Sequence, residues 1–155
     1  MPRYVYGHSL GGALAIELAS GVSQDEFAGL IVEATFTSIP DLLRGMRYGW
    51  LPGIGLVVTQ RFDSAERIPK VQVPLLVLHG TADNVVPHTM ADELYDRAGS
   101  ATKQLVKIDG GSHSGWRSGA AQYRDAVQSF MHAAATSSVS AAASAAGSSL
   151  PAPRR

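Results

Sequence analysis

Blocks of apolar residues alternate with polar stretches along the chain, and their periods predict strands and helices in turn. Residues 3–7 form a short β-rich run, and Leu10, Leu14 and Leu18 follow at helical spacing. Residues 29–35 (GLIVEAT) are nearly continuously apolar, as expected of a strand buried on both faces of a sheet. The chain therefore begins as strand, helix and strand, which favours a parallel sheet.

The second half of the chain continues this alternation. Residues 74–79 (PLLVLH) predict a third strand and residues 88–98 a helix. Residues 104–108 (QLVKI) predict a fourth strand, and residues 119–134 a final helix. Strands that alternate with helices are typical of a layered α/β fold with a parallel sheet. The sequence therefore predicts one α/β domain with a parallel sheet.

Two segments have no clear period. Residues 36–70 mix glycine, proline, aromatic and charged residues, and predict an excursion with one or two short helices. Residues 135–153 are rich in Ala, Ser, Gly and Pro, which bury little apolar surface to offset the entropy lost on ordering. We therefore predict a domain over residues 1–134, with 36–70 as a reduced cap, and a disordered tail over residues 135–155.

Composition restricts partners and chemistry only modestly. Thirteen Lys and Arg balance thirteen Asp and Glu, so no basic excess indicates a nucleic-acid partner. Cysteine is absent, which excludes disulfides, thiolate metal sites and a cysteine nucleophile. No apolar run approaches the ~20 residues that a membrane helix needs. Residues 1–20 show no targeting signal, so we assign the chain to the cytoplasm by default; a signal or anchor upstream of Met1 would change that assignment.

The segment Gly7-His8-Ser9-Leu10-Gly11 is the most informative chemical motif. It matches Gly-x-Ser-x-Gly, the nucleophile elbow, in which a strained strand-to-helix turn exposes a serine hydroxyl. We expect glycines two residues before and after Ser9 because side chains there would clash. The adjacent helix N-terminus, starting with the Leu10 N–H, can stabilise an oxyanion. The alternative interpretation is an N-cap serine at a glycine-rich helix start.

A serine hydroxyl becomes a nucleophile when a base removes its proton, and histidine is the usual base. We favour His113, because it lies in a glycine-rich loop (GGSHSG) after the fourth predicted strand. Structural roles suit the other four histidines better. His8 lies inside the elbow and points away from the serine, and His79 lies within a strand. His88 starts a helix, and His132 lies near the end of the last one.

A carboxylate must orient that histidine, and in this type of fold it lies between serine and histidine in the chain. Asp83 follows the third predicted strand and is favoured over Asp63, which follows no strand, and Asp109, which shares the loop of His113. Its alternative role is that of an Asx-turn residue. No pair of histidines or carboxylates shows metal-ligand spacing, so neither a metal nor a cofactor is expected.

Four segments resemble the α/β-hydrolase superfamily, most specifically the Bem46-like group, which is related to the ABHD13-type serine hydrolases of the serine aminopeptidase clan. They are GHSLGG at 7–12, IVEATFTSI at 31–39, PLLVLHGTADNVVP at 74–87 and GGSHSGW at 110–116. The first is shared by all α/β-hydrolases, whereas EATFTSI narrows the group. The resemblance covers residues 3 to 133 and implies that Ser9 is the nucleophile, Asp83 the acid and His113 the base.

The resemblance extends only to the carboxyl-terminal half of such a protein. The expected fold is a three-layer α/β-hydrolase fold truncated at the amino end, from the nucleophile strand onward. Leu10 would supply one oxyanion donor, while the second would come from an absent loop, and losing one donor costs ~10²–10³ in rate. The nucleophile strand would form an exposed edge, which predicts self-association.

Two functions from different classes fit these residues. The first is a serine hydrolase that cleaves an ester, thioester or amide of a small-molecule or lipid-like acyl substrate through an acyl-enzyme. The second is a catalytically impaired remnant that acts as a binding or regulatory module, or that needs a separate amino-terminal half. Apolar residues between 36 and 70 suggest an acyl-binding or membrane-facing wall, and packing against the sheet is their alternative role: Leu43, Trp50, Leu51, Ile54 and Leu56.

Overall fold

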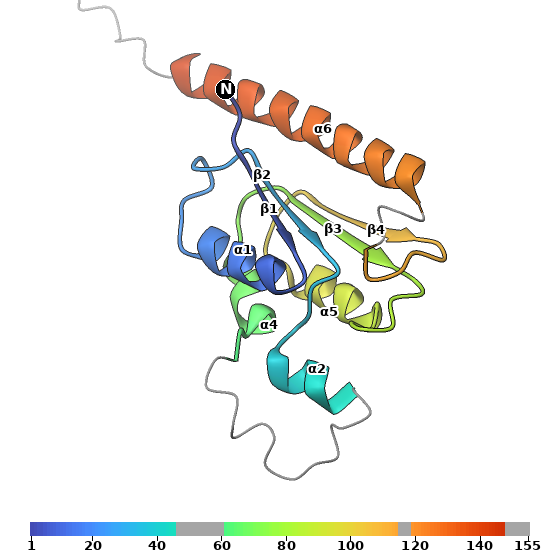
Figure 1. Ribbon diagram of the computed structural model, residues 1–155. Coiled ribbons are helices and arrows are strands. Elements are labelled where there is room, and N and C mark those ends of the chain that lie inside the picture. Colours follow the sequence, from blue (N-terminus) through green and yellow to red (C-terminus); the bar gives the residue numbers. More distant parts are fainter. Residues whose placement is uncertain (46–60, 115–118, 148–155) are drawn as a thin grey trace, which may run out of the picture.

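The computed structural model describes residues 1–45, 61–114 and 119–147. Its centre is a four-stranded sheet in the order β1-β2-β3-β4, in which every neighbouring pair is parallel (Figure 1). The strands are β1 (Tyr4–His8), β2 (Gly29–Glu33), β3 (Leu75–Gly80) and β4 (Lys103–Ile108). Each lies where the apolar pattern predicts a strand, and the parallel α/β arrangement is confirmed.

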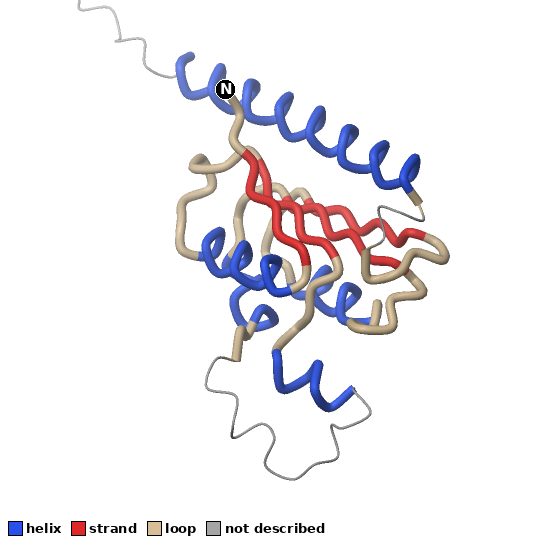
Figure 2. Tube along the Cα trace, viewed as in Figure 1, coloured by secondary structure: helices blue, strands red, loops and turns tan. Residues whose placement is uncertain are grey.

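Helices cover both faces of this sheet, which gives three layers (Figure 2). On one face lie α1 (Leu10–Ser20), α4 (Ser64–Arg67), the 3-10 helix η1 (Ile68–Lys70) and α5 (Thr89–Arg97). The long helix α6 (Ala120–Gly147) crosses the opposite face. Because β2 and β3 are buried on both faces, their side chains alternate between the two helical layers.

That alternation divides the core into two main clusters. Leu30 and Val32 of β2 pack toward α1 with Ile16, whereas Ile31 packs with Phe130 of α6. Gly29 lies under the α6 layer, where a Cβ would come within 2.8 Å of the Phe130 ring. The sheet is thereby packed between helices on both faces, and the carboxyl ends of its parallel strands lie at one edge.

The segment 36–70 contains short helices at both of its described ends. Helix α2 (Ile39–Gly45) follows β2, and α4 with η1 precedes β3. Leu43 of α2 is partly buried. Residues 46–60 lie outside the described residues, and with them the remaining apolar positions that suggested an acyl-binding wall: Trp50, Leu51, Ile54 and Leu56.

The prediction of a disordered tail from residue 135 is wrong for residues 135–147, which continue α6 to Gly147. Alanine has the highest helix propensity of any residue, and each residue added to an already formed helix contributes one hydrogen bond without a new nucleation step. The absence of large side chains was therefore a weaker signal than the alanine content. Residues 148–155 lie outside the described part of the chain.

The leucine stripe of α1 identifies the helix correctly but does not face the sheet. Ile16 and Ala19 of α1 are fully buried, whereas Leu14 and Leu18 are each 50% exposed. Strand β1 beside them is the sheet's edge, with β2 on one side and no strand among the described residues on the other. No helix in the described ranges combines the length and hydropathy needed to cross a membrane.

The exposed edge and leucine stripe support a prediction about solution behaviour. We expect the 16.3 kDa chain to elute in size-exclusion chromatography as an oligomer or aggregate, because association covers β1 and the stripe. The double substitution Leu14→Glu and Leu18→Glu should shift elution toward the monomer, whereas Gln128→Glu on exposed α6 should not. A sharp monomer peak with cooperative unfolding for the unmodified chain would contradict this prediction.

Candidate active site

Ser9 occupies a strained position between β1 and α1. Its backbone has φ 54° and ψ −119°, a left-handed region that is unfavourable for any residue with a side chain. The surroundings stabilise this conformation, because the Ser9 N–H donates to the Glu33 carbonyl at 2.8 Å. Leu10 is the first residue of α1, so its N–H has no intrahelical acceptor and is available for an anion.

The two glycines of the motif differ in the space around them, which leaves no room for a side chain at Gly7 but room for one at Gly11. A Cβ on Gly7 would lie 2.2 Å from the carbonyl oxygen of Gly11, so glycine is obligatory at Gly7. A Cβ on Gly11 would meet no described atom within 4 Å, so the prediction that a side chain at Gly11 would clash is wrong. The second tight glycine is Gly12, where a Cβ would approach the Thr35 Cβ to 2.6 Å.

Three side chains from different strand ends lie in a row at the carboxyl edge of the sheet. His113 Nε2 is 3.1 Å from Ser9 Oγ, and His113 Nδ1 is 2.8 Å from Asp83 Oδ2. With the proton on Nδ1, the imidazole donates to Asp83 and accepts from the Ser9 hydroxyl. The three residues follow β1, β3 and β4, whose parallel course brings their ends together.

The rival aspartates lie elsewhere. Asp63 pairs with Arg61 at 3.2 Å, and Asp109 contacts the Thr81 hydroxyl at 3.4 Å. The structure thus brings Asp83, and neither rival, against His113.

Asp83 makes the contacts of both roles that its sequence position suggested. Its Oδ1 accepts the N–H groups of Val85 and Val86 at 2.8 Å each, as in an Asx turn, while Oδ2 faces His113. Burial alone would raise the pKa of this carboxyl. Hydrogen bonds from the Val86 N–H, the His113 ring and the Val85 N–H outweigh burial and leave the pKa of Asp83 below its ordinary value. The group is therefore ionised at neutral pH.

Two further histidines contact these residues, and sequence reasoning did not assign them such contacts. His79 is buried in β3, and its Nε2 bonds the Val86 carbonyl at 2.9 Å and lies 3.2 Å from Asp83 Oδ2. Burial lowers the pKa of His79 and favours its neutral form. His8 Nε2 bonds the His113 carbonyl at 2.8 Å and thus ties the His113 loop to the end of β1.

Glycines allow the His113 loop to approach β3. A Cβ on Gly80 would lie 2.1 Å from the carbonyl oxygen of Gly111, so only glycine fits at the end of β3. The same carbonyl accepts the Ala82 N–H at 2.9 Å, and Gly110 adopts φ 64°. The glycine pair after β4 was a visible sequence signal for this loop, whereas the requirement at Gly80 became clear only from the structure.

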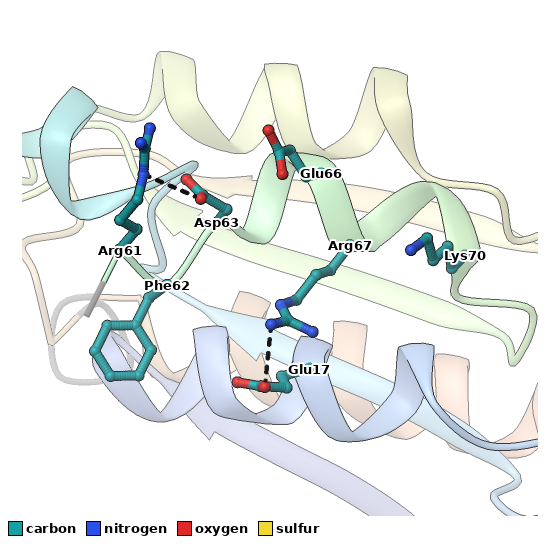
Figure 3. A pocket seen from close by; sticks show the side chains of 7 residues that line it. All are labelled: Glu17, Arg61, Phe62, Asp63, Glu66, Arg67 and Lys70. Carbon is teal, nitrogen blue, oxygen red and sulfur yellow. Dashed lines mark ion pairs between the residues drawn. The ribbon is translucent and has the colours of Figure 1, made fainter. Parts of the chain in front are cut away.

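A separate cavity of about 460 Å³ lies between α1 and α4 (Figure 3). Six of its seven lining residues are charged: Glu17, Arg61, Phe62, Asp63, Glu66, Arg67 and Lys70. Two ion pairs lie on its wall, Arg61–Asp63 and Arg67–Glu17, each at 3.2 Å. Its lining contains neither Ser9 nor His113, so this cavity is distinct from the serine site.

Within the described ranges, no group of three or more His, Cys, Asp or Glu residues is arranged to hold a metal ion. The polar atoms around Ser9 instead form hydrogen bonds with one another. A partly buried hydroxyl on a strained turn, an imidazole that contacts it and a buried carboxylate behind the imidazole are set on a three-layer parallel α/β fold. These are the features of the α/β-hydrolase class.

Comparisons with known proteins agree with this class. The family model described as serine aminopeptidase, S33, matches residues 43–117. Protein bem46 of Schizosaccharomyces pombe is 35% identical over 115 residues, which cover 71% of this chain and 37% of that protein. Lysophosphatidylserine lipase ABHD12 of Danio rerio is 34% identical over 113 residues, covering 63% of this chain and 29% of that protein.

Solved structures share the fold. Est1E from Butyrivibrio proteoclasticus superposes with a TM-score of 0.64 at 20% sequence identity, covering 88% of this chain and 62% of that one. The chain belongs to the α/β-hydrolase superfamily and is a Bem46-like member of it. It spans 37% of the length of bem46, and its described residues form part of an α/β-hydrolase fold.

Proposed function

We propose that the chain hydrolyses an ester, thioester or amide bond through an acyl-enzyme, with Ser9, His113 and Asp83 as its catalytic triad. Membership in a hydrolase family supports the general activity. The observation that carries the finer proposal is the continuous row of contacts, 3.1 Å from Ser9 Oγ to His113 Nε2 and 2.8 Å from His113 Nδ1 to Asp83.

In the first half-reaction, Ser9 Oγ attacks the acyl carbon while His113 Nε2 takes the hydroxyl proton. Asp83 holds Nδ1–H and stabilises the imidazolium, and the Leu10 N–H stabilises the oxygen anion of the tetrahedral intermediate. Collapse of this intermediate expels the leaving group, which takes the proton from His113. Water then attacks the acyl-serine with His113 as base, and the acid is released with Ser9 restored.

An apolar acyl group suits the surroundings of this row. A buried cluster joins Ala13, one turn beyond Ser9 in α1, to Phe36 and to Val86 beside Asp83. Ile39 and Leu42 of α2 pack against it and remain partly exposed. These side chains support a small-molecule or lipid-like acyl substrate. The acyl group would reach them from solvent at α2, where Ile39 and Leu42 are partly exposed.

A fluorophosphonate probe tests the proposal, because it reacts covalently with activated serines. The purified 155-residue chain should be labelled. Ser9→Ala should abolish labelling, because it removes the nucleophile, and Ser112→Ala, an exposed serine of the same sheet edge, should not. Intact-mass spectrometry reads out a single adduct. Labelling that persists in Ser9→Ala would refute the assignment.

The open edge of the sheet supports a second candidate. Because β1 has no outer neighbour among the described residues, the alternative function is that of a module that binds or completes a separate segment at this edge. A chain that unfolds cooperatively yet takes no probe would support this non-catalytic function. Labelling that depends on Ser9 would contradict it.

A further inference from the structure

A buried threonine contacts the backbone of the proposed nucleophile. Thr35 is 2% exposed, and its Oγ1 donates a hydrogen bond of 2.8 Å to the Ser9 carbonyl oxygen. It lies two residues beyond β2, within the IVEATFTSI segment. The triad chemistry described above does not use the Thr35 side chain, so its contact with Ser9 calls for a separate explanation.

A turn at Ala34 brings this threonine to the α1 face. Ala34 has φ 48°, a left-handed conformation, while its N–H still bonds the Leu78 carbonyl of β3 at 2.9 Å. In a continuous strand, residues 33 and 35 would share a face. The turn instead places Thr35 against Gly12 of α1, where a Cβ on that glycine would come within 2.6 Å of the Thr35 Cβ. Close packing therefore fixes the hydroxyl.

The contacted oxygen belongs to the same peptide unit as the proposed oxyanion donor. The Ser9 carbonyl and the Leu10 N–H share one planar group, and in a trans peptide they point in opposite directions. A donor on the carbonyl therefore sets the direction of the N–H. It also draws electron density toward the oxygen, which makes the N–H a better donor.

We propose that Thr35 is a positioning residue that aims the Leu10 N–H at the oxyanion and strengthens it as a donor. This inference rests on the proposed function. Satisfying the carbonyl does not require Thr35, because the Gly12 N–H already donates to the Ser9 oxygen at 3.0 Å. The carbonyl accepts at both of its lone pairs, and the second bond limits rotation of the peptide plane.

Two variants separate the hydroxyl from the shape of the side chain. Thr35→Val keeps the branched shape and removes the donor, whereas Thr35→Ser keeps the donor and removes a methyl group. With a short p-nitrophenyl ester, Thr35→Val should lower kcat about tenfold and leave KM unchanged, since an oxyanion donor acts only in the transition state. Thr35→Ser should stay within about twofold of the unmodified chain. The rate of fluorophosphonate labelling should follow the same order.

Amide hydrogen exchange, measured by NMR, tests the same contact without relying on activity. Thr35→Val should speed exchange of the Gly12 amide, which donates to the same carbonyl, about threefold or more, and Thr35→Ser should not. Unchanged kcat and exchange in Thr35→Val, equal losses in both variants, or a rise in KM alone would overturn the inference. If the unmodified chain takes no probe, the proposed function fails, and the exchange result still decides whether Thr35 positions this peptide.

Discussion

Replacing His113 by alanine should lower the rate of Ser9 acylation by about 10⁴-fold or more, and Asp83→Asn should lower it by a similar factor. In the unmodified chain the Ser9 hydroxyl lies 3.1 Å from His113 Nε2, and the alanine variant has no base at that position. The asparagine variant places an amide where a carboxylate faces Nδ1 at 2.8 Å. It therefore loses the charge that stabilises the imidazolium and that selects the tautomer able to accept the Ser9 proton.

Matched controls distinguish this effect from a general loss of structure. His132→Ala and Asp125→Asn change the same residue types at exposed positions of α6, and should retain the rate of the unmodified chain within about twofold. The measurement is the second-order rate of fluorophosphonate labelling, with circular dichroism to establish folding. A folded His113→Ala chain that is labelled as fast as His132→Ala would eliminate His113 as the base.

The largest effect on stability is expected at Gly7. A Cβ there would lie 2.2 Å from the Gly11 carbonyl oxygen and 2.7 Å from the Gly12 Cα, and both are backbone atoms that cannot rotate away. Gly7→Ala should therefore lower the free energy of unfolding by about 3 kcal/mol, because the β1–α1 turn must open. Urea unfolding followed by circular dichroism measures the loss.

Gly11→Ala is the matched control within the same motif. Its Cβ would meet no atom within 4 Å, and alanine is a better helix former than glycine, so this variant should gain about 0.5 kcal/mol. Changes of opposite sign in the free energy of unfolding would establish that Gly7 is needed to avoid a clash and that Gly11 is not. Equal destabilisation would show instead that another part of the chain contacts Gly11.

Local patterns sufficed for the strands and for the choice of chemistry. Strands β2 and β3 were predicted within about two residues of their ends, because burial on both faces leaves a nearly continuous apolar run that no other element explains as well. The motif around Ser9 and the order of the polar loops pointed to Asp83 and His113, because parallel strands bring their carboxyl ends to one edge.

Sequence patterns failed where a second segment of the chain decides which face of a helix is buried or how far the helix extends. The leucine stripe of α1 predicted a helix but not the face that is buried, because Ile16 rather than Leu14 meets β2. The tail was predicted from its lack of large side chains, whereas α6 had already formed upstream and alanine extends it. In both cases the missing information was what lies beside the helix or before it.

The sequence by itself determined the layered parallel fold, the serine turn and the three polar residues at strand ends, since each depends on periods or turns within a few neighbouring residues. Only the tertiary structure decided which glycines are obligatory and which side chains hold Ser9 and His113. The Thr35 bond to Ser9 spans 26 positions and the His8 bond to the His113 carbonyl spans 105. Such contacts depend on how strands are placed side by side, which no local pattern encodes.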